Sequence, residues 1–176
     1  MAEGLWQKAG NGLMFNISWL AIVGGESLWI ALPVAITHLV VHMLWLGQGR
    51  RELLFIGGIA LFGLALDNFL FAIGVFTLAG ASAAAPLWLS CLWPVLATTL
   101  GHAFAVLQRN LPLAAVAGAA GGFMSYAAGT AMSAVGYGDP VYGPIIITAL
   151  WAALFPALAL AARWALTETR GEASLV

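Results

Sequence analysis

Six apolar runs, separated by short polar segments, restrict what this chain can fold into. They cover residues 12–23, 28–46, 53–78, 86–107, 112–135 and 144–164. Most of the runs approach the ~20 residues that a helix needs to cross a bilayer. Of the 176 residues, 62% are hydrophobic and only 7% are charged, whereas soluble domains average about 25% charged residues. We therefore predict an all-α fold, in which residues 1–176 form a single domain with a bundle of six transmembrane helices.

Prolines mark both the starts and the interiors of these runs. Three stand at first helical positions, where the missing N–H costs nothing: Pro86, Pro112 and Pro144. Three others lie inside runs and predict kinks or local openings of the helix: Pro33, Pro94 and Pro156.

The basic residues indicate the orientation of the bundle. All six lie in the N-terminal lead, in the two loops on that side, or at the C-terminal end: Lys8, Arg50, Arg51, Arg109, Arg163 and Arg170. The three opposite loops contain Glu26 and Asp139 but no lysine or arginine. By the positive-inside rule we predict that both termini are cytoplasmic.

Composition and motifs exclude several classes of function. The net charge is −1 and no basic tract is present, so a nucleic-acid partner is excluded. The chain contains no P-loop, GxSxG, HExxH or CxxC motif, and nothing in it indicates a particular cofactor. Its one cysteine, Cys91, cannot form an intrachain disulfide.

Asp67 is the most unusual residue of the apolar runs. It lies about 21 Å along the third run from the cytoplasmic side, and a charge within the membrane costs roughly 2.5–3.5 kcal/mol. We predict that Asp67 is a catalytic proton acceptor or a polar anchor, and the alternative is a structural hydrogen bond between helices. The residues expected in the same outer polar layer are Asn68, Trp93, Ser125, Tyr126 and, as a cap, Glu26.

This outer layer suggests a binding slot. We predict that Trp88 and Trp93 form the walls of an apolar substrate slot, the alternative being that they only pack. Asn68, Ser125 and Tyr126 are expected to orient Asp67 within the slot.

A second polar layer is expected nearer the cytoplasm, where the three histidines of the chain reach similar depths together with Asn16. His102 is predicted to be a general acid or base, because the pKa of a histidine is easily moved near 7. We expect no metal. The alternative is a three-histidine metal site, because His38 and His42 are one helical turn apart and His102 could complete the set.

The fifth run carries a series of small residues: Gly118, Gly122, Ser125, Gly129 and Ser133. Small residues at such spacing let another helix approach closely. The partner is either a helix of the same bundle or a second copy of the chain in a homo-oligomer.

Four stretches of the sequence carry a family resemblance. They are Asn16-x-x-Trp19, Gly63-x-x-x-Asp67-x-x-Leu70-x-x-x-Gly74, the segment from Pro86-Leu87-Trp88 to His102, and Gly121-Gly122-x-x-Ser125-Tyr126-x-x-Gly129. With them the chain resembles a family of small bacterial inner-membrane proteins known as domain of unknown function number twenty-eight seventy-eight. The resemblance implies a multi-pass protein of the bacterial inner (plasma) membrane without an established activity. It also implies association with lipid-modifying enzymes, including ones similar to cyclopropane fatty acid synthase.

Three functions are consistent with these features, and the sequence leaves open whether the chain is an enzyme. The leading hypothesis is a protein that acts on, or assists the modification of, lipid-phase substrates such as acyl chains or isoprenoids. The second is a small proton-coupled transporter or channel, which an intramembrane aspartate and kinked helices would suit. The third is a structural subunit of a membrane complex.

Overall fold

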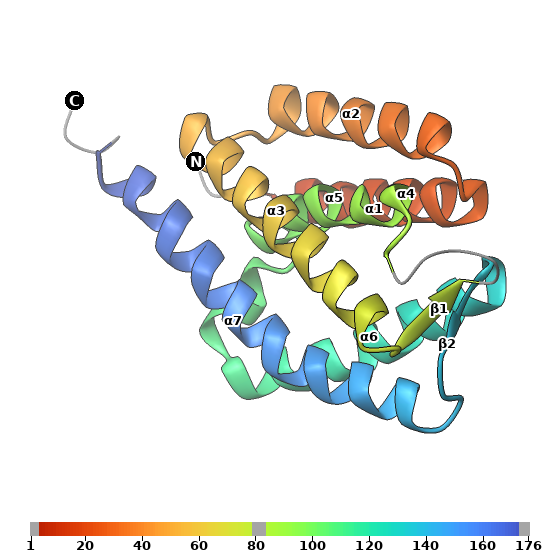
Figure 1. Ribbon diagram of the computed structural model, residues 1–176. Helices are drawn as coiled ribbons and strands as arrows, with labels where there is room; N and C mark the ends of the chain where they lie inside the picture. The colour runs from red at the N-terminus through yellow and green to blue at the C-terminus, as the bar shows by residue number, and fades with distance from the viewer. Residues whose placement is uncertain (1–3, 79–83, 173–176) are drawn as a thin grey trace.

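The computed structural model describes residues 4–78 and 84–172, with side chains up to Leu166. The chain is mostly helical, which confirms the all-α class (Figure 1). Its helices are α1 (Leu5–Gly25), α2 (Leu28–Trp45), α3 (Arg50–Ala72), α4 (Leu87–Ser90), α5 (Leu92–Leu100), the 3-10 helix η1 (Ala105–Arg109), α6 (Leu111–Met132) and α7 (Tyr142–Glu172). Two short strands, β1 (Phe76–Leu78) and β2 (Val135–Tyr137), form one antiparallel pair.

Four of the described helices are long and apolar enough to cross a membrane. They are α2, α3, α6 and the Tyr142–Leu166 part of α7. In the most apolar 18-residue stretch of each of these helices, only 17% to 33% of the residues are buried inside the protein. Large apolar side chains such as Trp29, Leu44 and Trp164 are 91%, 83% and 76% exposed. Such an apolar exterior suits a lipid surrounding and not water.

Two helices end before the apolar runs that predicted them. The third run was expected to be helical to residue 78, but α3 ends at Ala72. Gly74 then adopts a positive φ of 77°, a conformation that glycine accepts at no steric cost, and the chain continues as β1. The fifth run was expected to be helical to residue 135, but α6 ends at Met132 so that Val135 can pair with Leu78.

The fourth run differs most from the single helix expected over residues 86–107. It contains α4, a break at Cys91, the nine-residue α5, a turn and η1. Pro94 cannot donate a backbone hydrogen bond to Ser90, which explains the break. The hydroxyls of Thr98 and Thr99 bond the carbonyls three residues earlier, at 2.7 and 2.6 Å, and so compete with the helical ladder just before α5 ends.

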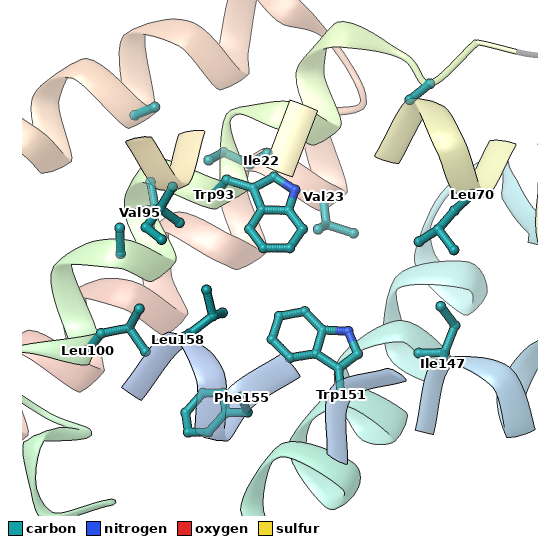
Figure 2. Close-up of a cluster of buried hydrophobic side chains, with 14 of the residues drawn as sticks. Ile22, Val23, Leu70, Trp93, Val95, Leu100, Ile147, Trp151, Phe155 and Leu158 are labelled. Carbon is teal, nitrogen blue, oxygen red and sulfur yellow. The ribbon is translucent and has the colours of Figure 1, made fainter. Parts of the chain in front are cut away.

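The short helix α5 lies at the centre of the molecule and packs against α1, α2 and α3. The hairpin of α6 and α7 forms a separate layer below them in Figure 1. Trp93 of α5 and Trp151 of α7 join the two layers, with stacked rings whose centroids are 5.8 Å apart (Figure 2). At the end of the molecule near the strands, the backbone N–H of Ala134 donates to Glu26 Oε2 at 2.6 Å.

Candidate functional site

Asp67 accepts a hydrogen bond from Trp93, whose ring packs against the space left by Gly63. The side chain of Asp67 is 1% exposed, and its Oδ2 accepts a hydrogen bond from Trp93 Nε1 at 2.8 Å. Gly63 lies one turn before Asp67 on α3, and a methyl group added there would overlap the Trp93 ring. The Gly63-x-x-x-Asp67 spacing therefore creates the room that lets an indole reach the carboxylate.

Asp67 also lines a cavity between the two layers. The cavity has a volume of about 260 Å³, and most of its wall is apolar. Three other predicted slot residues, Trp88, Trp93 and Ser125, line it as well, and so does Tyr126. The structure therefore brings four of the five predicted binding residues around one hollow that contains the carboxylate.

Asn68 and Glu26 are placed elsewhere. Asn68 is not among the residues that line the cavity; its amide nitrogen donates to the carbonyl of Leu64 at 2.8 Å, and its oxygen accepts from the backbone of Ala85 at 3.3 Å. Glu26 is exposed and bonds the backbone of Ala134, so it fastens the turn between α1 and α2 to the end of α6. Both residues stabilise the surroundings of the cavity.

The small residues of α6 have two roles, in packing against α7 and in lining the cavity. Methyl groups added at Gly118 and Gly122 would collide with Trp151 and Phe155 of α7, so these glycines permit close packing inside the same chain. Gly121 and Gly129 line the cavity, and a methyl group at either would meet nothing within 4 Å. The glycines of α6 thus allow α7 to pack closely against α6, and they leave space for the cavity.

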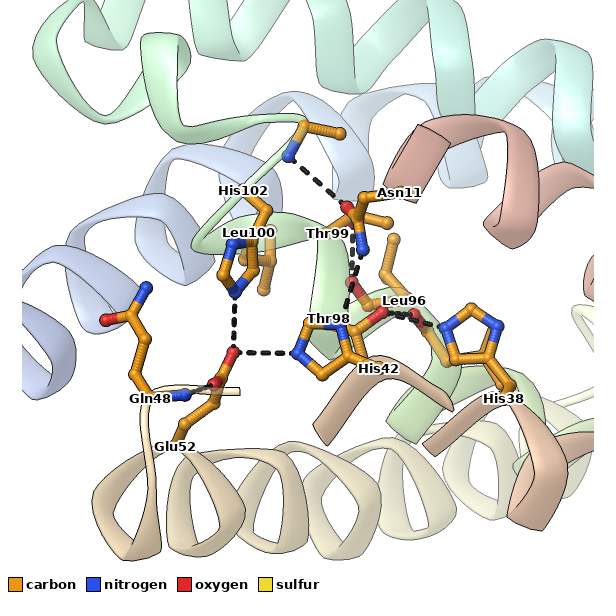
Figure 3. A network of polar contacts seen from close by, with 12 residues as sticks. Asn11, His38, His42, Gln48, Glu52, Leu96, Thr98, Thr99, Leu100 and His102 are labelled. Atoms are coloured by element: carbon orange, nitrogen blue, oxygen red, sulfur yellow. Dashed lines mark hydrogen bonds and ion pairs between the residues drawn. The ribbon is translucent and has the colours of Figure 1, made fainter. Parts of the chain in front are cut away.

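A second buried cluster lies between α2, α3 and the end of α5 (Figure 3). The Nε2 atoms of His42 and His102 both lie at hydrogen-bond distance from Glu52 Oε1, at 3.0 and 2.8 Å. The three residues are at most 1% exposed. The two imidazole rings meet edge to face, with centroids 4.9 Å apart. Two histidines and one carboxylate therefore converge on a single point.

Further polar groups surround this cluster. The backbone N–H of Gln48 donates to Glu52 Oε2 at 2.6 Å. The fully buried Asn11 donates its amide N–H to His42 Nδ1 at 3.4 Å and accepts from the backbone of Ala103 at 3.3 Å. These contacts fix both ends of the carboxylate and the orientation of one imidazole.

His38 and Asn16 lie outside the cluster, although the sequence suggested one shared layer. His38 has both ring nitrogens engaged, Nδ1 with the Ser18 hydroxyl and Nε2 with the Thr98 hydroxyl, each at 2.9 Å. Asn16 is exposed and donates to the carbonyl of Gly12 at 2.8 Å. Among the described residues, Glu52 thus occupies the third position that the three-histidine alternative gave to His38.

Sequence reasoning missed Glu52 and Asn11. Glu52 was left outside the third run, which was expected to begin at residue 53, but α3 begins at Arg50 and buries Glu52. The sequence does contain a signal for Glu52. It is the only acidic residue in the first turn of α3, and it follows His42 by ten residues. For Asn11, the expected start of the first helix at residue 12 was too late, because α1 begins at Leu5.

The chain was compared with protein families, with curated proteins and with solved structures. A family model described as protein of unknown function (DUF2878) matches residues 8–157. The chain belongs to this family. The DUF2878 match runs from α1 into α7, so it contains both the cavity and the histidine cluster, and it confirms the resemblance seen in the sequence. No curated protein and no solved structure matches the chain.

Proposed function

We propose that this protein binds a lipid-phase substrate, an acyl or isoprenoid chain, in the cavity between α5 and the α6–α7 hairpin, and acts on it or presents it to a modifying enzyme. One observation carries the proposal: an apolar hollow of about 260 Å³ contains a buried carboxylate. Ligand sites of small molecules have this character, with apolar walls and a few fixed polar groups.

The size and lining of the cavity support an apolar occupant. An apolar cavity of about 150 Å³ already binds benzene, and this one is larger. Side chains from the two layers supply its wall, including Phe15 and Trp19 of α1 and Phe155 of α7. A hydrocarbon chain would fill the apolar part of the hollow and leave the carboxylate of Asp67 for a polar end of the same molecule.

Asp67 would hold or deprotonate the polar end of the substrate. Trp93 donates to its Oδ2, and no group of the described residues forms a hydrogen bond with its Oδ1. The proposal assigns this second oxygen to the ligand. Trp88 and Trp93 would flank the chain, while His102, which does not line the cavity, would serve a separate role.

The proposal includes a six-span topology in the bacterial inner membrane, with both termini cytoplasmic. In this arrangement α1 and the α4–α5–η1 segment complete the bundle that the four long apolar helices begin. The positions of the arginines support it, because Arg50 and Arg51 begin α3 and Arg109 ends η1, at the end opposite the strands (Figure 1). A reporter fused to the C-terminus tests this orientation, and a signal from the external side of the membrane would contradict it.

Comparative lipid mass spectrometry tests the proposed function. Membranes would be compared from a strain lacking the gene and from the same strain carrying the wild-type gene, Asp67→Asn, Gly129→Leu or Gly57→Leu. Gly129→Leu fills the cavity, whereas Gly57→Leu adds the same side chain at an exposed position of α3 where nothing lies within 4 Å. The proposal expects a lipid species that the wild type and Gly57→Leu restore and the two cavity variants do not.

Binding is measured separately on purified protein. Wild-type and Gly57→Leu proteins in detergent should carry a bound chain-bearing lipid that Gly129→Leu lacks. Identical lipid profiles in every strain, with expression verified and no lipid specific to the wild-type protein, would overturn the proposal. The transporter and structural-subunit alternatives would then be tested by uptake and by copurification.

A further inference from the structure

The cluster around Glu52 has the composition of a metal site. One ligand atom each from His42, Glu52 and His102 lies within 4.8 Å of the other two. Two imidazoles with one carboxylate are the protein ligands of many catalytic zinc sites and of non-haem ferrous sites. The cluster shares no residue with the wall of the cavity, so it is a second and separate site.

We propose that His42, Glu52 and His102 bind one divalent transition-metal ion, zinc or ferrous iron. Metal bonds of about 2.0–2.2 Å in a tetrahedral arrangement separate neighbouring ligand atoms by roughly 3.4 Å. The Nε2 atoms now lie 3.0 and 2.8 Å from Oε1, so shifts of a few tenths of an ångström would admit the ion. Hard oxygen-only ions such as calcium do not fit two imidazoles.

Charge also favours a cation at this point. With neutral imidazoles the cluster carries the negative charge of Glu52, whose side chain is 2% exposed. Removing a carboxylate from water costs several kcal/mol unless a cation or strong hydrogen bonds compensate it. A divalent ion bound by all three residues supplies this compensation directly.

The surroundings supply the outer contacts that metal ligands require. Gln48 N–H holds Glu52 Oε2, which leaves Oε1 to face the histidines. Asn11 lies against His42 Nδ1, and a turn of its amide, which would give up the 3.3 Å bond from Ala103 N–H, would present the oxygen that a metal-bound imidazole needs for its Nδ1–H. Glu52 is the third residue of α3, so the site lies near the N-terminal end of that helix.

The alternative is a hydrogen-bonded triad without metal, in which both imidazoles donate Nε2–H to Oε1. Elemental analysis separates the two. The full-length protein would be purified anaerobically in detergent without a polyhistidine tag, and its metals measured by mass spectrometry. We expect about one equivalent of zinc or iron per chain in the wild type, and more than about tenfold less in Glu52→Gln and His102→Gln.

His38→Gln is the matched control, because His38 is also buried in α2 but its ring nitrogens lie against the hydroxyls of Ser18 and Thr98 and not against Glu52. It should retain the metal of the wild type. A second readout does not depend on the folding of variants: removing the ion from the wild-type protein with a chelator should lower its thermal midpoint, and adding zinc or ferrous ion should restore it.

Wild-type protein from metal-supplemented cells that carries no ion, and whose midpoint is unmoved by chelator or added metal, would overturn the site. So would a folded Glu52→Gln protein that retains the metal of the wild type. Because lipid binding is measured at the cavity, either proposal can fail while the other stands.

Discussion

Helix α3 carries two buried carboxylates that the fold treats in opposite ways. Glu52 receives hydrogen bonds from two histidines and a backbone N–H, whereas Asp67, about 22 Å farther along the helix, receives one from Trp93. Glu52 is enclosed by its partners, and Asp67 borders a cavity. The two carboxylates thus differ in the number of their partners. Glu52 has its oxygens occupied by neighbouring groups, whereas Asp67 has an oxygen that can bind a ligand.

The largest difference between the two sites should appear on removing the carboxylate. Glu52→Ala leaves the buried imidazoles of His42 and His102 without the carboxylate that both contact. Each buried polar group left unsatisfied costs about 1–3 kcal/mol, so we expect a loss of roughly 2–6 kcal/mol in the free energy of unfolding. Asp67→Ala deprives only Trp93 of a partner and should cost less. Denaturant or thermal unfolding in detergent measures both, and a smaller loss for Glu52→Ala than for Asp67→Ala would reverse the comparison.

Overpacking beside Asp67 should have an intermediate effect. Gly63→Val would push branched methyl groups into the Trp93 ring, and overpacking of this kind typically costs about 1–3 kcal/mol. Gly57→Val, on the exposed face of the same helix, is the control and should be near neutral. Equal thermal midpoints for the two variants would show that Trp93 does not depend on the space at Gly63.

The smallest effect isolates the indole hydrogen bond. Trp93→Phe retains an aromatic ring against Trp151 but removes the donor to Asp67, and hydrogen bonds between membrane helices average roughly 0.6 kcal/mol and reach about 1.7. Trp29→Phe, at a site that is 91% exposed, controls for the change of ring. A double-mutant cycle with Asp67→Ala, which removes the acceptor, gives the coupling, and a value of zero would contradict the bond.

Depth along a helix was readable from the sequence, because each residue adds a fixed rise. Counting residues brought Asp67, Trp93, Ser125 and Tyr126 to one level, and the structure places all four around one cavity. Counting also brought His42 and His102 to one level, where they meet at Glu52.

Rotation about the helix axis was not readable. A helix that is apolar on its lipid face and on its buried face has no amphipathic contrast, so the sequence does not show which face turns inward. Asn16 was therefore expected in the interior, where Asn11 lies, and His38 was considered a partner for His102 although its nitrogens face Ser18 and Thr98. The break at Cys91 was suggested by Pro94, but the end of α5 depends on threonine side chains whose hydrogen bonds follow from the fold.

The separation of the cluster residues along the chain has a consequence for biogenesis. His42 and Glu52 are ten residues apart across one loop, whereas His102 follows Glu52 by fifty. During synthesis at about 5–20 residues per second, His42 can meet the carboxylate as soon as α2 and α3 form a hairpin, and His102 arrives roughly 3–10 s later. The carboxylate is therefore first paired with one histidine, and the arrival of the end of α5 completes its enclosure.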